Sequence, residues 1–116
     1  MSDLEYKKLS NHCTALLNFL NKKLHLGKIE SAVYKLKLFT NNCELSELKV
    51  LSDQIVIFAS KNVANIKNRN IDDLDGHLEI MEYIKEYKTQ FSEEEINEIW
   101  KRVDNIIAIS VKISKN

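Results

Sequence analysis

The chain contains no proline and only two glycines among its 116 residues. These residue types supply the tight turns of β-sandwiches and barrels and the phosphate-binding loops of nucleotide enzymes, whereas helices need little of either. Apolar residues make up 44% of the chain and charged residues 29%, so the chain can bury a core and is not intrinsically disordered. We therefore expect one all-α domain, a compact bundle of about five helices, over residues 1–116.

Apolar residues recur at three- and four-residue steps early in the chain, which is typical of helices with one buried face. Ser2 and Glu5 have the spacing of a capping box, in which each side chain accepts a hydrogen bond from a free amide of the first turn. A first helix should begin there and end near Gly27, because glycine commonly terminates helices. A shorter second helix is expected over residues 29–39.

The same period continues over residues 45–66 and predicts a third helix, with Asn41 and Glu44 at its start. Within it, residues 54–59 have the sequence QIVIFA and are apolar almost all round. We expect them to be the most deeply buried part of the bundle, although their β-branched side chains would also suit a short strand.

A polar interruption separates this region from the last part of the chain. Residues 68–76, NRNIDDLDG, are mostly short and polar and predict a loop, after which a helix is expected over residues 77–89. Ser92 and Glu95 form a second capping box. The final helix should therefore begin at Glu93.

The final helix is rich in bulky apolar residues. Trp100 lies on its inward-facing stripe, which predicts a position in the core. Near its end, apolar residues cover more than one face: Ile106, Ile107, Ile109, Val111 and Ile113. We expect part of this set to stay exposed and to bind a partner or a second copy in a homodimer.

Basic and acidic side chains are equal in number, 17 of each, but unevenly placed. Residues 71–98 hold ten acidic and two basic side chains, and the flanking segments are net positive. Such a region can attract a basic protein and accelerate its encounter, although an ordinary solvated helix face would look similar. The carboxylates expected to contact a partner are Asp72, Asp73, Asp75, Glu79, Glu82, Glu86, Glu94 and Glu98.

The basic residues give little support for nucleic-acid binding. The lysines that could touch phosphates lack interleaved aromatic residues and a net basic balance; they are Lys22, Lys23, Lys28, Lys35 and Lys37. No apolar run approaches the roughly 18 residues of a membrane span, and no secretory hydrophobic segment follows the N-terminus. We expect a cytoplasmic protein that binds neither nucleic acid nor a membrane.

Residues 71–82 have the spacing of a cation-binding loop. Asp73, Asp75 and Glu82 fall at the third, fifth and twelfth places, and Gly76 falls at the sixth, where such a loop turns sharply. This pattern resembles the EF-hand family of calcium-binding proteins.

The resemblance has one departure at its start. Ile71 occupies the first place, where the family normally has an aspartate. If the loop holds one extra residue, Asn70 and Asp72 would supply the first ligands. The alternative is that Gly76, like Gly27, simply ends one helix and lets the next begin.

The motif around Gly76 is echoed around Gly27, because G-x-[IL]-E-x-[AM]-x-Y occurs at both positions. EF-hands occur in pairs, so the resemblance extends over about residues 19–90, although the first loop lacks carboxylates at the ligand places. It implies a regulator with weak or lost calcium binding, whose ligands would be Asp73, Asp75, Glu79 and Glu82.

The sequence contains no recognisable catalytic constellation, because CxxC, glycine-rich phosphate-loop and G-x-S-x-G motifs do not occur. The HEPN ribonucleases pair an arginine with a nearby histidine, but here Arg69 and His77 are separated by seven residues that include a glycine. Cys13 and Cys43 are expected to be reduced, buried thiols. We therefore expect a small non-enzymatic protein, an inhibitor, immunity protein or adaptor, that binds another protein.

Overall fold

Six α-helices and one short 3-10 helix make up the regular structure in the computed structural model, which describes residues 3–42 and 44–115. No strand occurs in these ranges, so the all-α class predicted from the sequence is confirmed. None of the helices there combines the length and apolarity needed to cross a membrane. The helices are α1 (Asp3–Leu24), α2 (Gly27–Asn41), α3 (Leu45–Lys61), α4 (Val63–Lys67), α5 (Glu79–Tyr87), the 3-10 helix η1 (Lys88–Gln90) and α6 (Glu93–Ser114).

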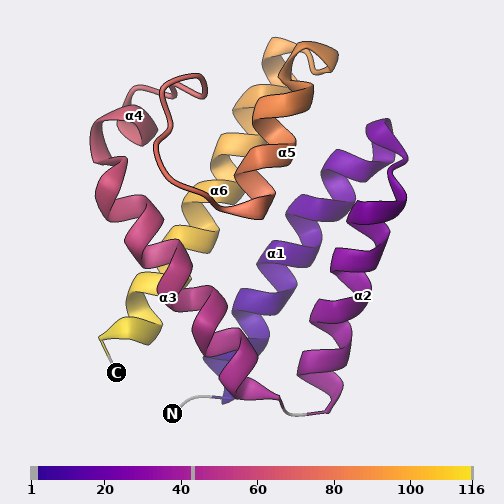
Figure 1. Cartoon of the computed structure of the whole chain (residues 1–116), viewed down its shortest axis with the longest axis vertical. Coiled ribbons are helices and arrows are strands. Elements are labelled where there is room, and N and C mark those ends of the chain that lie inside the picture. The colour runs from indigo at the N-terminus through magenta and orange to yellow at the C-terminus, as the bar shows by residue number, and fades with distance from the viewer. Residues whose placement is uncertain (1–2, 43, 116) are drawn as a thin grey trace.

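The long helices run up and down the long axis of the molecule (Figure 1). α1 and α2 form an antiparallel hairpin joined by only two residues, His25 and Leu26. His25 has a φ of 54°, and this left-handed conformation reverses the chain. α1 also packs against α6, and α3 packs against both α6 and α1. The first and last helices are therefore neighbours.

One cluster of buried apolar residues draws on every long helix. Leu9, Leu16 and Leu20 of α1 are fully buried, as the helical period predicted. Trp100 is 2% exposed, which confirms its core position. Cys13 is a buried, free thiol as expected, whereas Cys43 lies outside the described residues.

The capping box at the start of α6 is confirmed. The hydroxyl of Ser92 accepts a hydrogen bond from the backbone N–H of Glu95 at 3.1 Å. In return, Oε1 of Glu95 accepts one from the backbone N–H of Ser92 at 2.8 Å. α6 therefore begins at Glu93, as predicted. The other predicted capping box involves Ser2, which lies outside the described residues.

The expectation that residues 54–59 would be the most deeply buried segment is wrong. Ile55 and Phe58 are buried, but Gln54 is exposed and Ile57 is 54% exposed. The reason is that α6 and α1 cover one side of α3 and leave its outer face open. These residues form an amphipathic helix within the bundle.

The helix predicted over residues 45–66 is divided in two at Asn62, whose side chain is 1% exposed. Its amide nitrogen donates to the carbonyl oxygens of Phe58 at 2.9 Å and Asp75 at 2.8 Å. Its amide oxygen accepts from the backbone N–H of Asp75 at 2.7 Å. Side-chain bonds to the backbone compete with continuation of a helix, and here they fasten the helix break to the following loop.

The loop predicted after residue 67 is confirmed but is longer than expected. Gly76 has a φ of 86°, a left-handed conformation that favours glycine. Leu78 is extended, and α5 begins only at Glu79, two residues later than the sequence predicted.

The expected exposed apolar strip is not found on the described part of α6. Ile106, Ile109 and Ile113 are buried, and Ile107 and Val111 are half-buried. α6 lies against both α1 and α3, so helices of the same chain cover more than one of its faces. The expectation of an exposed strip on this helix is therefore wrong.

Two serines mark the contact between α3 and α6. Ser52 and Ser110 are both fully buried, and the hydroxyl of Ser52 donates to the carbonyl oxygen of Ser110 at 3.4 Å. The Ser110 hydroxyl has no hydrogen-bond partner among the described residues. Small side chains at a helix contact let the two helix axes approach closely.

Candidate functional site

The eight carboxylates predicted to contact a partner lie on three consecutive segments. They are Asp72, Asp73 and Asp75 in the loop, Glu79, Glu82 and Glu86 on α5, and Glu94 and Glu98 on α6. We call these eight residues the acidic surface. All are exposed except Glu82 and Glu98, which are half-buried. Figure 1 shows the loop and α5 in the upper part of the molecule, with α6 starting near the upper end of α5.

Basic side chains neutralise part of the acidic surface. The ion pairs are Lys88–Asp72, Lys28–Glu86 and Arg102–Glu98. Lys28 comes from the first turn of α2, and its Nζ lies 3.5 Å from Oε2 of Glu86. It also lies 5.3 Å and 5.5 Å from the ring centroids of Tyr83 and Tyr87. Because Lys28 and Glu86 are each about half exposed, their ion pair contributes less than ~1 kcal/mol.

The other carboxylates of the acidic surface have no Lys or Arg partner among the described residues. These are Asp73, Asp75, Glu79, Glu82 and Glu94. Asp73 accepts a hydrogen bond from the side-chain amide of Asn70 at 2.7 Å, and Glu79 accepts one from the Tyr83 hydroxyl at 2.5 Å. Burial, reinforced by that bond, raises the pKa of Tyr83 to about 12. The Tyr83 hydroxyl therefore stays protonated at neutral pH and donates to Glu79.

The residues predicted to bind calcium are not brought together. They are Asp73, Asp75, Glu79 and Glu82. Within residues 3–42 and 44–115, no three His, Cys, Asp or Glu side chains are placed to hold a metal ion. Oε1 of Glu82 lies 3.8 Å from Nδ1 of His77, and Glu79 is engaged by Tyr83.

Two asparagines organise the loop in which the EF-hand pattern occurs. The Asn65 side chain donates to the carbonyl oxygen of Asp73 at 2.8 Å, and Asn62 holds the backbone of Asp75 from both sides. Near Gly27, the other half of the pattern coincides with the two-residue link between α1 and α2. The side-chain amides of Asn62 and Asn65 therefore fix the shape of the loop between α4 and α5.

Arg69 and His77 are engaged by different parts of the fold. The guanidinium of Arg69 binds the carboxylate of Asp104 and lies 5.2 Å from the ring centroid of Trp100, both on α6. His77 is 79% exposed beside Glu82. No hydrogen bond joins the arginine to the histidine among the described residues.

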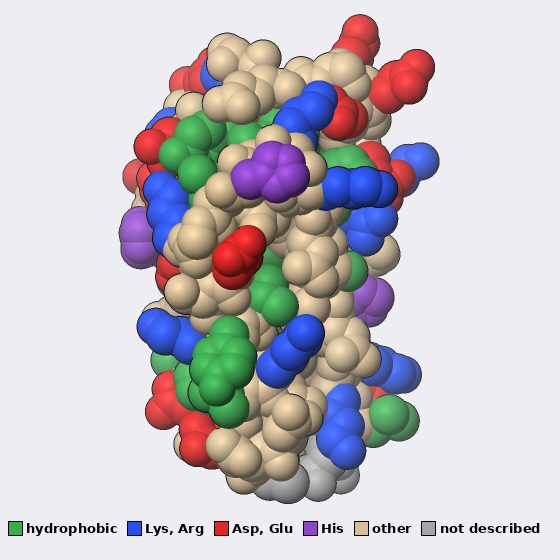
Figure 2. Space-filling view, turned by 90° about the vertical axis from the view of Figure 1, so that its right-hand side faces the viewer, with side chains coloured by type: hydrophobic (Ala, Val, Ile, Leu, Met, Phe, Trp, Pro, Cys, Tyr) green, Lys and Arg blue, Asp and Glu red, His purple; other side chains and the backbone are tan. Residues whose placement is uncertain are grey.

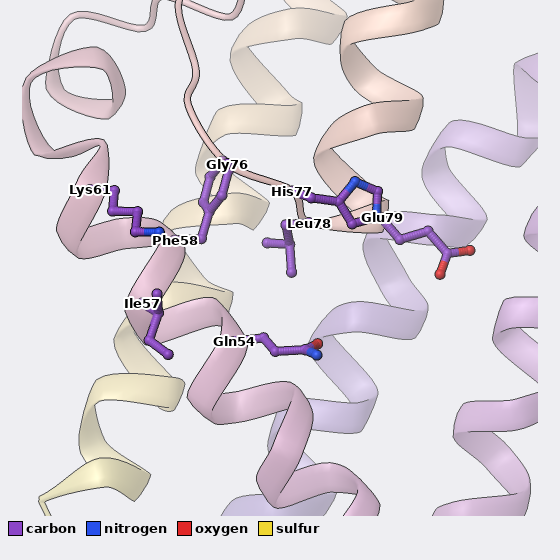
Figure 3. A pocket seen from close by; sticks show the side chains of 8 residues that line it. All are labelled: Gln54, Ile57, Phe58, Lys61, Gly76, His77, Leu78 and Glu79. Atoms are coloured by element: carbon purple, nitrogen blue, oxygen red, sulfur yellow. The ribbon is translucent and has the colours of Figure 1, made fainter.

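Two cavities that sequence reasoning missed lie along α3. One of about 340 Å³ separates α3 from the end of the loop, as Figure 3 shows. Its lining residues are Gln54, Ile57, Phe58, Lys61, Gly76, His77, Leu78 and Glu79. The other, of about 280 Å³, lies between α2 and α3 and shares Gln54 and Glu79 with the first. We call the two cavities together the groove along α3. The sequence did not indicate them, because the exposure of α3 depends on which other helices cover it.

Positive charge is found on the side of the molecule formed by α2. Figure 2 shows lysine and arginine side chains along this face, with hydrophobic side chains reaching the surface between them. The exposed lysines of α2 are Lys28, Lys35 and Lys37. Tyr34 on the same helix is 63% exposed. Figure 2 also shows acidic side chains on this face, and Glu30 of α2 is exposed, so this side of the molecule carries both signs of charge.

No family model, curated protein or solved structure matches this chain. Its function must therefore be inferred from its own residues. The features available for that inference are the acidic surface and the groove along α3.

Proposed function

We propose that this chain is a non-enzymatic protein that binds a basic partner protein through its acidic surface. Inhibitor, immunity protein and adaptor are the roles that such binding would serve. The proposal is supported by one observation above all, the five exposed or half-exposed carboxylates that have no Lys or Arg partner among the described residues. Unpaired carboxylates leave a field that steers a cationic partner and accelerates association.

The ion pairs at the edge of the acidic surface are compatible with partner binding. Lys28 and Glu86 are 49% and 56% exposed at their side chains, and their atoms are 3.5 Å apart. Such a pair contributes little to stability. An arginine of the partner could therefore replace Lys28 at Glu86 at small cost, since arginine binds carboxylates with two parallel hydrogen bonds.

Charge reversal on α5 tests the proposal. The variant carries Glu79→Lys, Glu82→Lys and Glu86→Lys, and both proteins are used to capture binding proteins from an extract of the source cells. We expect the wild-type chain to retain a basic protein and the variant to lose it. Circular dichroism should show unchanged helicity, because these side chains are exposed or half-buried.

A matched control reverses three charges elsewhere. Lys7, Lys8 and Lys37 are exposed on α1 and α2, and replacing them with glutamate should leave capture intact. The interaction should weaken as salt rises, because screening shortens the reach of exposed charges. Equal capture by wild type and the α5 variant would refute a role for the acidic surface.

A further inference from the structure

The outer face of α3 carries a seam of exposed residues in a regular order. Glu47, Val50, Gln54, Ile57 and Lys61 follow one another at steps of three and four, so they lie in one row along the helix. Val50 is 52% and Ile57 54% exposed, and the other three are also exposed. The two apolar residues of this row have the seven-residue spacing found where two helices pack side by side, and the other three residues are polar or charged.

When the order of the seam is reversed, each residue is matched with one of a complementary kind: acidic with basic, and apolar with apolar. An acidic residue begins the seam and a basic residue ends it, each seven residues from Gln54, and a β-branched residue lies on either side of Gln54, Val50 four residues before it and Ile57 three residues after it. A twofold symmetric interface uses the same patch on both subunits and therefore needs such self-complementarity. We propose that α3 pairs antiparallel with α3 of a second copy of this chain, about an axis at Gln54.

The pairing matches charge with charge and apolar with apolar. Glu47 faces Lys61 of the partner subunit, and Lys61 faces the partner's Glu47. Val50 packs against Ile57 of the partner subunit, and the two Gln54 amides meet on the axis. Among the described residues, neither Glu47 nor Lys61 has an ion pair in its own chain, so both are available to a second copy.

The groove along α3 provides space for this contact. Gln54 lines both of its cavities, Val50 lines the one of about 280 Å³, and Ile57 and Lys61 line the one of about 340 Å³. In Figure 3, residues 76–79 and α3 form the two sides of the larger cavity. Each end of the seam therefore has room for side chains of the other subunit.

The size of the seam indicates a weak dimer. From Glu47 to Lys61 the helix rises about 21 Å at 1.5 Å per residue. One helix pair of this length buries less than the roughly 1,200 Å² of a stable interface. The dimer should therefore form and dissociate with concentration, and it leaves the exposed carboxylates of the loop free for another partner.

Sedimentation equilibrium over a wide concentration range tests the proposal. The apparent mass should rise from the 13.5 kDa of one chain toward twice that value. Glu47→Lys and Lys61→Glu should each raise the dimer dissociation constant about tenfold or more, since each places like charges together twice per dimer. The double variant exchanges the charges and should restore the dimer, whereas Lys37→Glu, off the seam, should change nothing.

A cross-link locates the symmetry axis. In a Cys43→Ser background, Gln54→Cys should form a disulfide-linked dimer under mild oxidation, because only a residue near a twofold axis meets its own copy. Asn105→Cys, exposed on α6, is the control and should stay monomeric. A chain that stays monomeric at the highest concentration, or a dimer insensitive to both seam charges, overturns the proposal.

Discussion

The guanidinium of Arg69 binds the carboxylate of Asp104 with two hydrogen bonds, of 2.9 and 2.7 Å. It also lies over the ring of Trp100, 5.2 Å from its centroid. Hydrogen bonding to Asp104 raises the pKa of Arg69 above its usual value. These contacts fasten the start of the long loop to α6, although Arg69 itself adopts a left-handed φ of 56°.

Arg69→Ala and Arg69→Gly should distinguish the contribution of the ion pair to stability from that of the backbone conformation. Both remove a bidentate but partly exposed pair, worth about 1 kcal/mol. Only glycine relieves the left-handed conformation, which costs other residues about 1 kcal/mol. We expect Arg69→Ala to destabilise the fold by about 1 kcal/mol and Arg69→Gly to be nearly neutral in urea unfolding. Equal losses in the two variants would contradict a strained backbone at this residue.

Asn62→Ala should loosen the loop. The substitution leaves the N–H and carbonyl of Asp75 without their side-chain partners, in a partly buried place. Leaving buried polar groups unpaired costs about 1–3 kcal/mol. We expect a loss of that order in thermal unfolding and faster hydrogen exchange at the Asp75 amide. Asn65→Ala removes an exposed bond to the Asp73 carbonyl and a longer one of 3.5 Å to the Asn62 side chain, and it serves as the milder comparison.

Ser110→Ala should stabilise the protein. The hydroxyl of Ser110 is fully buried and has no hydrogen-bond partner among the described residues. On folding it therefore loses its hydrogen bonds to water and gains none in their place. Removing it should raise the free energy of unfolding by about 1 kcal/mol. Ser114→Ala, at an exposed position on the same helix, should have almost no effect. A lower melting temperature for Ser110→Ala would show that the hydroxyl has a partner.

Stability should fall at alkaline pH. Burial raises the pKa of Cys13 from 9.0 to about 12, and burial with the Glu79 bond raises that of Tyr83 from 10.0 to about 12. Both folded-state values lie above the unfolded ones, so the protonated groups favour folding below pH 9 and that contribution is lost between pH 9 and 12. Urea unfolding across this range should show the decline. In the Tyr83→Phe variant, the loss of stability above pH 10 should be smaller than in the wild-type protein.

Calcium should have little effect on this chain. Asp73, Glu79 and Glu82 are engaged by Asn70, Tyr83 and His77, respectively, rather than gathered around one point. Titration of the chelator-treated protein should give no saturable heat at micromolar calcium, and the melting temperature should not rise. Binding in that range, lost on Glu82→Gln, would support the EF-hand hypothesis instead.

Local signals in the sequence were enough to predict the start of the last helix. Ser92 and Glu95 are three residues apart, and the bonds of the capping box involve no other part of the chain. The burial of Trp100 followed from its place in the apolar stripe. Features that depend on neighbours in sequence, or on one helix period, are therefore accessible without a structure.

Features that depend on distant residues were not accessible. The break at Asn62 comes from bonds to Asp75, thirteen residues further on. The exposure of Ile57 depends on which helices cover α3, and this cannot be deduced from the helical period of the sequence. In the candidate site, the acidic residues could be identified from the sequence, but the pairing of Lys28 with Glu86 joins segments 58 residues apart.

The packing of α1 against α6 determines when the protein can fold during its synthesis. α1 leaves the ribosome long before α6 has been translated, so its buried leucines have only the hairpin partner α2 and then α3 to cover them. Contacts between such distant segments form late and slow down folding. The nascent chain is therefore open to proteases and chaperones until α6 has emerged, and only then becomes a closed bundle.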